Sequence, residues 1–152
     1  MEIKTYADLI DWTRTLHSHL ARCLAESATE HEEIRARSLL DYLATHEGEL
    51  EKTVEGFESE ADQRALKTYV YDLLSHKPIQ THRTCDHPYT KLDFDGICRE
   101  IFDFHDQVTS LYQYLADEAE IPETQELMEN LLNLERHEAM RMAREVGRMQ
   151  DV

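Results

Sequence analysis

The feature that most constrains the fold is an internal repeat at a fixed spacing. When the chain is shifted by 91 residues, nine identities fall among 38 aligned positions without a gap. Most are apolar residues at helical spacing, but His46-Glu47 also coincides with His137-Glu138. Apolar periodicity does not explain a shared His-Glu dipeptide, so the match indicates that one helical unit occurs twice.

Helix-starting signals predict where the helices begin. Thr5 and Thr29 each stand three residues before an acidic side chain, which is the pattern of a capping box. Pro122 suits the first turn of a helix, and two more helices are expected to start near Ser59 and Asp93. With only 4 Gly and 3 Pro among 152 residues, long helices are favoured over strands and turns.

These helices predict an all-α chain that forms a single domain, residues 1–152. Two long helical hairpins are expected at about 5–57 and 93–150, and a crossover at 58–92 joins them and contains the short helix. The irregular part of that crossover is too long for a turn between adjacent antiparallel helices. Two equivalent hairpins with a long crossover are the plan of a ferritin-like antiparallel four-helix bundle.

Three segments resemble helices of rubrerythrin-like proteins in the ferritin-like superfamily. LLDYLATHEGELEK is similar to their second helix, IFDFHDQVTSLYQYLADEAE to the third and LLNLERHEAMRMA to the fourth. The likeness covers most of the long-helix sequence and lies in pattern more than in motif. It implies a bundle whose centre carries carboxylate and histidine ligands for iron.

The resemblance also shows where this chain departs from a di-iron protein. A di-iron site of this type takes one Glu from each of two helices and Glu-x-x-His from each of the other two. His105 stands at the third-helix Glu position, and Arg14 stands at its counterpart in the first helix. The fourth helix has Glu135-x-x-Glu138 instead of the motif. A standard di-iron centre is therefore not expected, whereas one ion bound by His105, Glu135 and Glu138 remains an alternative.

The periodicity predicts that Glu47 and Glu138 point inward at the same height of the bundle, with His46 and His137 at their flanks. A buried carboxylate needs a partner. The first alternative is a divalent ion, iron or a similar metal. The second is an ion pair with Arg14 of the first helix, and the third is water or a proton shared between carboxylates of raised pKa.

The candidate metal ligands are thus histidines and glutamates of three long helices. They are His46, Glu47, His105, Glu135, His137 and Glu138. His17 and His19 of the first helix are interpreted as surface or boundary residues. No glycine-rich phosphate loop and no Ser/His/Asp order is present, so no catalytic residue is predicted; any activity would be metal-dependent redox chemistry.

A second group of histidines lies in the crossover. The segment HKPIQTHRTCDHP brings together His76, His82, Cys85 and His87. Cysteine and histidine are zinc ligands, but this spacing matches no common zinc module. A zinc site and a plain polar loop therefore both remain open.

Charge and hydropathy limit the partners and the location. The 32 acidic and 16 basic side chains give a formal charge of −16, which disfavours nucleic acid and anionic membranes. No segment is apolar for long enough to span a bilayer, no signal-peptide pattern is seen, and three widely spaced cysteines argue against a disulfide framework. A cytoplasmic location is expected. Trp12, Tyr69, Tyr71 and Phe102 are candidates for an apolar patch that forms a homodimer.

Two functions follow from these observations. The first is a ferritin-like protein that stores, senses or uses iron or a similar ion at a degenerate site. The second is a non-catalytic helical module that dimerises or docks a partner, in which Arg14, Glu47 and Glu138 form a structural polar layer.

Overall fold

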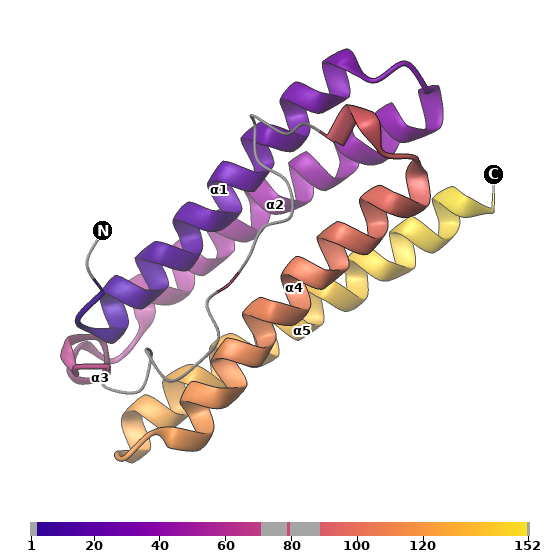
Figure 1. The fold of residues 1–152 in the computed structure, drawn as a ribbon. Coiled ribbons are helices and arrows are strands. Elements are labelled where there is room, and N and C mark those ends of the chain that lie inside the picture. The colour runs from indigo at the N-terminus through magenta and orange to yellow at the C-terminus, as the bar shows by residue number, and fades with distance from the viewer. Residues whose placement is uncertain (1–2, 71–78, 80–88, 152) are drawn as a thin grey trace.

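The computed structural model describes residues 3–70, 79 and 89–151, and these are almost entirely helical (Figure 1). Four helices are long: α1 (Tyr6–Glu30), α2 (Ile34–Glu60), α4 (Phe94–Glu118) and α5 (Pro122–Gln150). A short helix, α3 (Gln63–Lys67), follows α2, and a 3-10 turn, η2 (Tyr89–Lys91), precedes α4. The described residues contain no strand, only an isolated bridge between Thr5 and Tyr69. The prediction of an all-α chain is confirmed.

Three of the predicted helix starts are confirmed. Thr5 caps α1, where its hydroxyl accepts the Asp8 N–H and the Asp8 carboxylate accepts the Thr5 N–H. Asp93 caps α4 by accepting the Gly96 N–H at 2.8 Å. Pro122 lies in the first turn of α5, where its missing N–H costs nothing.

The other two predicted starts are wrong. α1 continues through Thr29, whose hydroxyl donates to the Glu26 carbonyl in the last turn instead of capping the next helix. α2 runs past Ser59, and the short helix begins only after the Asp62 cap. Tyr69 follows the short helix and forms the bridge to Thr5, the residue that caps α1. Ser and Thr also occur within helices, where they bond back to a preceding carbonyl, so a capping pattern alone does not fix a boundary.

The four long helices form two antiparallel pairs. α1 packs along α2 and α4 along α5, and α2 contacts both helices of the other pair (Figure 1). Arg35 at the start of α2 lies 5.2 Å from the ring centroid of Phe94 at the start of α4. Arg35 also reaches the Gln150 carbonyl at the end of α5. α2 and α4 therefore run in the same direction, and α5 runs opposite to both.

The two hairpins correspond at an interval of 88 residues. α4 begins and ends 88 positions after α1, and α5 begins 88 positions after α2. All ten buried residues of α1 have a buried counterpart 88 positions later in α4. The predicted pairing of His46-Glu47 with His137-Glu138 is therefore wrong by three residues, and the structural counterpart of Glu47 is Glu135.

The described ends of the crossover are attached to opposite ends of α1. Near the start of α1, the Tyr6 N–H donates to the Thr68 carbonyl at 3.0 Å. Near its end, the Tyr89 N–H donates to the Ser27 hydroxyl at 3.1 Å. These contacts place the start of α4 beside the end of α1, which gives the second hairpin its direction.

The cysteines differ in their bonding. Cys23 of α1 is disulfide-bonded, whereas Cys98 of α4 is a buried free thiol. One bonded cysteine beside a free thiol is not a disulfide framework, so the expectation that the chain has none stays a prediction. Disulfides are typical of oxidising compartments, and the cytoplasmic location stays a prediction.

Membrane-spanning helices are not found in the part of the chain that the structure describes, where no helix combines sufficient length with sufficient apolar character.

Leu43 and Leu131, which are equivalent at the 88-residue interval, test the packing of the two hairpins. Both are almost completely buried, with exposed fractions of 1% and 0%. Leu43→Ala and Leu131→Ala should each lower the free energy of unfolding by about 2–5 kcal/mol, because each leaves a cavity in the core. Thr45→Ala, at an exposed position of α2, should change it by less than about 0.5 kcal/mol in the same urea titration. A negligible effect at either leucine would contradict the packing described here.

Candidate functional site

Four ionisable side chains meet in the middle of the core, one from each long helix. They are His17 of α1, Glu47 of α2, His105 of α4 and Glu135 of α5, and none is more than 1% exposed. These four residues are called the central ring. His105 and Glu135 stand 88 positions after His17 and Glu47, so each hairpin contributes one histidine and one glutamate from equivalent places.

Histidines and glutamates alternate around the ring. His17 Nδ1 lies 2.7 Å from Glu47 Oε2, and His17 Nε2 lies 2.8 Å from Glu135 Oε1. His105 Nε2 contacts the other oxygen of Glu47. On the fourth side, His105 Nδ1 is 3.7 Å from Glu135 Oε2, beyond hydrogen-bond distance. The ring is therefore closed on three sides and open on the fourth.

The contacts of His17 determine its protonation. A neutral imidazole has one N–H, yet both nitrogens of His17 face carboxylate oxygens at hydrogen-bond distance. Burial by itself would lower the pKa of His17, but Glu135 and Glu47 outweigh it and raise the pKa to about 10. Burial likewise opposes the charge on His105, and Glu47 and Glu135 raise its pKa to about 9. Both histidines are imidazolium ions at neutral pH.

The two carboxylates shift in the opposite direction. Burial would raise the pKa of Glu135, but His17 and His105 lower it to about 2. The same opposition holds at Glu47, where His105 and His17 bring the pKa well below its ordinary value despite complete burial. Two imidazolium ions and two carboxylates make the ring neutral overall, which is how four buried ionisable groups avoid an uncompensated charge.

Three buried polar atoms at or beside the ring lack a hydrogen-bond partner: His105 Nδ1, Glu135 Oε2 and His46 Nε2. The first two face each other across the open side. His46 precedes Glu47 on α2 and is 6% exposed, and its ring centroid lies 6.3 Å from that of His105. The pKa of His46 is lowered, first by burial and also by the charge of His105, so its imidazole is neutral.

The structure brings together four of the six predicted metal ligands: Glu47, His105 and Glu135 in the ring, and His46 beside it. Glu138 was predicted to point inward, which is wrong: it is only partly buried and pairs with exposed Arg141 at 3.2 Å. His137 is exposed. Relative to Glu135, Glu138 lies about 60° around α5 and His137 about 160° around it.

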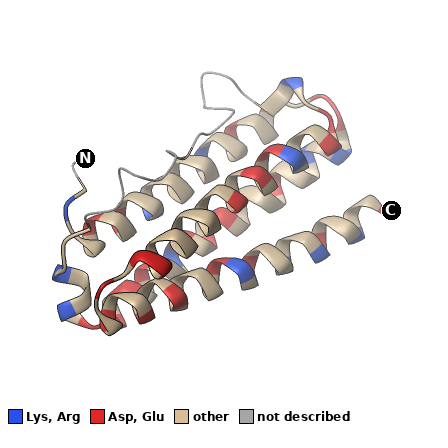
Figure 2. Ribbon diagram, turned by 60° about the horizontal axis from the view of Figure 1, so that its bottom comes forward, with Lys and Arg blue, Asp and Glu red and all other residues tan. Residues whose placement is uncertain are grey.

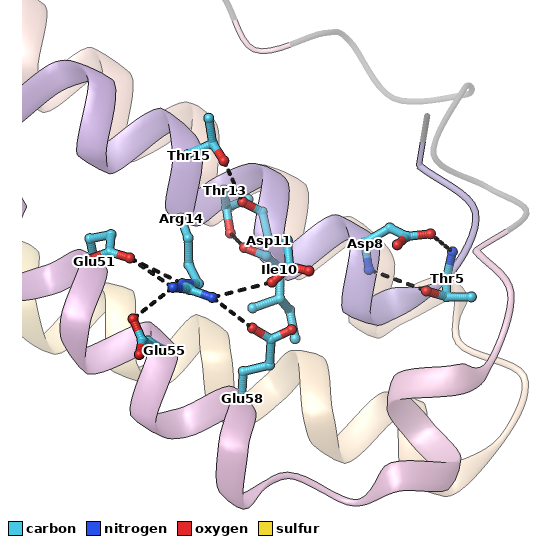
Figure 3. A network of polar contacts seen from close by, with 10 residues as sticks. All are labelled: Thr5, Asp8, Ile10, Asp11, Thr13, Arg14, Thr15, Glu51, Glu55 and Glu58. Carbon is cyan, nitrogen blue, oxygen red and sulfur yellow. Dashed lines mark hydrogen bonds and ion pairs between the residues drawn. The ribbon is translucent and has the colours of Figure 1, made fainter. Parts of the chain in front are cut away.

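Arg14 does not pair with Glu47 or Glu138, so the predicted Arg14–Glu47–Glu138 layer is wrong. The Arg14 guanidinium instead extends toward α2, where it contacts Glu51 at 3.0 Å, Glu55 at 2.7 Å and Glu58 at 3.3 Å (Figure 3). Asp11 of its own helix lies 3.4 Å away. One guanidinium thus serves four carboxylates that are outside the central ring.

His17 is the ring member that the sequence analysis missed, and its interpretation as a surface or boundary residue is wrong. It is fully buried and bonds to both glutamates of the ring. The spacing of the helix caps identifies it. Thr5 and Asp93 are 88 positions apart, and the same interval separates His17 from His105.

The described residues contain no group of three or more His, Cys, Asp or Glu side chains already converging as metal ligands. The crossover candidates His76, His82, Cys85 and His87 lie outside the described residues. Comparison with known protein families, curated proteins and solved structures finds no match to this chain. The ferritin-like resemblance and the metal site therefore stay predictions.

The candidates for a dimer patch do not share one environment. Trp12 and Phe102 are partly buried against the core, whereas Tyr69 is 56% exposed. Tyr71 lies outside the described residues. The homodimer stays a prediction.

The central ring predicts how stability changes with pH. The pKa of Glu135 falls from 4.5 to about 2, so its contribution is present above 4.5 and is lost as the pH falls toward 2. The pKa values of His17 and His105 rise from 6.5 to about 10 and about 9, so their contribution is complete below 6.5 and is lost as the pH rises through 9 to 10. In the presence of a chelator, the free energy of unfolding should decline from pH 6.5 to pH 10, and His17→Gln should reduce that slope. Equal slopes for both proteins would contradict the assigned protonation.

Glu58 provides a second pH test in the Arg14 cluster. Burial and then Asp11 raise the pKa of Glu58 to about 7, despite the opposing Arg14. Ionised Glu58 therefore destabilises the fold, and stability is lost as the pH rises through about 7. Glu58→Gln should raise the melting temperature at pH 8 and leave it almost unchanged at pH 5. Glu55→Gln, which removes a more exposed partner of Arg14, should give no gain at pH 8; an equal gain there would show a general charge effect.

Proposed function

We propose that this protein is a ferritin-like antiparallel four-helix bundle that binds a divalent metal ion, iron or a similar metal, at the central ring. Two matched helical pairs and a long connection between them support the bundle assignment, since ferritin-like folds join two such pairs by one crossover. Side chains that project inward from facing helices are the usual ligands in bundles of this kind.

The observation that carries the proposal is the open side of the ring. His105 Nδ1 and Glu135 Oε2 are buried, 3.7 Å apart and without a hydrogen-bond partner. Buried polar atoms nearly always have a partner, and an imidazole nitrogen opposite a carboxylate oxygen is a suitable pair of ligands for a cation. His46 Nε2 is a third unpartnered atom of the same kind beside His105.

Charge balance supports a divalent ion. The carboxylates of Glu47 and Glu135 carry two negative charges, which protonated His17 and His105 neutralise. One divalent ion would restore the same balance if both histidines lost a proton. Because metal–ligand distances are about 2.0–2.2 Å, the short His–Glu contacts would have to open as these protons leave.

The donor types limit the metal. The ring and His46 offer imidazole nitrogens and carboxylate oxygens, a set that suits iron, manganese or zinc. His105 Nδ1 and Glu135 Oε2 are the two donors at the open side, and His46 Nε2 is an additional unpartnered nitrogen beside His105. Both oxygens of Glu47 are held by His17 and by His105 Nε2. The ring lacks the two Glu-x-x-His motifs of a di-iron site, so we propose a single ion.

The competing function is a non-catalytic helical module in which the ring is structural. Its support is the closure of three sides by hydrogen bonds between oppositely charged groups. Breaking such a buried network by removing one member is costly, so the ring would hold the two hairpins in register for docking a partner. This function requires no ion.

Metal titration separates the two functions. Protein purified without chelator and then stripped should bind Fe(II), Mn(II) or Zn(II) saturably, at about one ion per chain. Bound metal should stabilise the fold by about 2.7 kcal/mol when the free metal is 100 times its Kd. The absence of saturable binding and of any thermal shift with all three ions would leave the structural function.

Variants test which residues bind. Glu135→Gln and His105→Gln should weaken metal affinity by at least about tenfold, because each removes a ligand atom from the open side. Glu138→Gln and His137→Gln are matched controls on α5, outside the ring, and should leave the affinity unchanged. If the controls lost binding and the ring variants kept it, the ion would belong to a different site.

A further inference from the structure

A hollow of about 310 Å³ lies between α2 and the C-terminal half of α5, away from the central ring. Its lining residues are Tyr42, Arg141, Arg144, Glu145 and Arg148. The three arginines stand three and four positions apart on α5, so they share one face of the helix. Figure 2 shows Lys and Arg recurring along the part of α5 that leads to the C-terminus.

This concentration of positive charge contrasts with the rest of the molecule. The chain as a whole carries a formal charge of −16, so an anion is repelled over most of the surface. Three guanidinium groups line the hollow together with one carboxylate, Glu145, and a second carboxylate, Glu138, pairs with Arg141, so the arginines outnumber these carboxylates. An arginine fork matches the geometry of phosphate and carboxylate oxygens.

The three arginines of the hollow differ in whether their guanidinium groups already pair with a carboxylate. Arg144 is exposed and has no partner among the described residues. Arg148 pairs with Glu145 at 2.9 Å, and Arg141 pairs with Glu138 at 3.2 Å. Both are pairs one turn apart on an exposed helix face, which contribute little to stability and exchange easily. A bound oxyanion can therefore take donors from all three arginines.

Tyr42 adds a neutral donor and connects the hollow to the core. Burial and then the charge of Glu145 raise the pKa of Tyr42, so its phenol keeps the O–H. Its ring centroid lies 6.0 Å from that of His46, which in turn lies 6.3 Å from that of His105. His46 is thus the one side chain between the hollow and the central ring along this path.

We propose that this hollow binds a small dianionic oxyanion, a phosphate group or a dicarboxylate, through Arg141, Arg144, Arg148 and the Tyr42 hydroxyl. The site is separate from the proposed metal site and does not depend on it. Bound anion would lie one side chain, His46, away from His105.

Calorimetric titration of the metal-stripped protein with inorganic phosphate, and separately with succinate, tests the site at fixed ionic strength. At least one of the two should bind saturably. Arg144→Gln should weaken that binding roughly tenfold, the effect of one lost charge-assisted hydrogen bond. Glu145→Gln should strengthen it, because it removes the competing carboxylate and releases Arg148.

Arg64→Gln is the matched control. Arg64 is an exposed arginine of α3. Its neighbour Ala65 lies by the start of α5, whereas the hollow lies at the other end of α5. It should leave the affinity unchanged. The proposal fails if neither anion binds saturably, or if Arg64→Gln weakens binding as much as Arg144→Gln, which would show an effect of net charge alone. The titration uses no metal, so its failure leaves the metal proposal unaffected.

Discussion

The architecture depends on one requirement: four ionisable side chains buried in the core must neutralise one another. An isolated charge in that position would cost more than the fold can supply, and a broken pair would leave an uncompensated ion. His17 and Glu135 come from different hairpins, as do His105 and Glu47. The pairing therefore fixes the height of one hairpin against the other, a register that apolar packing alone specifies less strictly.

The same requirement accounts for the correspondence of the hairpins. A ring of two histidines and two glutamates can be built from one helical pair used twice, provided that the pairs meet at equivalent heights. The common interval of 88 residues in helix bounds, buried positions and ring members meets this condition. Nδ1 of each histidine faces the glutamate of the same hairpin. Nε2 of each histidine faces the glutamate of the other hairpin.

The sequence predicts the helices and three of the ring members, and it fails on register. A shift of three residues turns a helix by about 300°, about 60° short of a full turn, so apolar stripes match almost as well at 91 as at 88. Because of this near-match, the interval of 91 residues pairs Glu47 with Glu138 and Arg14 with His105. The caps at Thr5 and Asp93 favour the interval of 88, as do the identities His17/His105 and Glu47/Glu135. The partners of Arg14 were beyond prediction for another reason: they depend on which α2 carboxylates a long side chain can reach.

Each hairpin contributes one histidine and one glutamate to the ring, but hydrogen bonds close only three of its four sides. His17 bonds to both glutamates, whereas His105 bonds only to Glu47 and leaves its Nδ1 unpartnered. His46 lies beside His105, and the residue 88 positions later is Leu134, so the second hairpin supplies no equivalent histidine. The two copies thus differ where the ring is open. At this one side the ring offers a ligand both a nitrogen donor and an oxygen donor. The three hydrogen-bonded sides of the ring hold these donors in position.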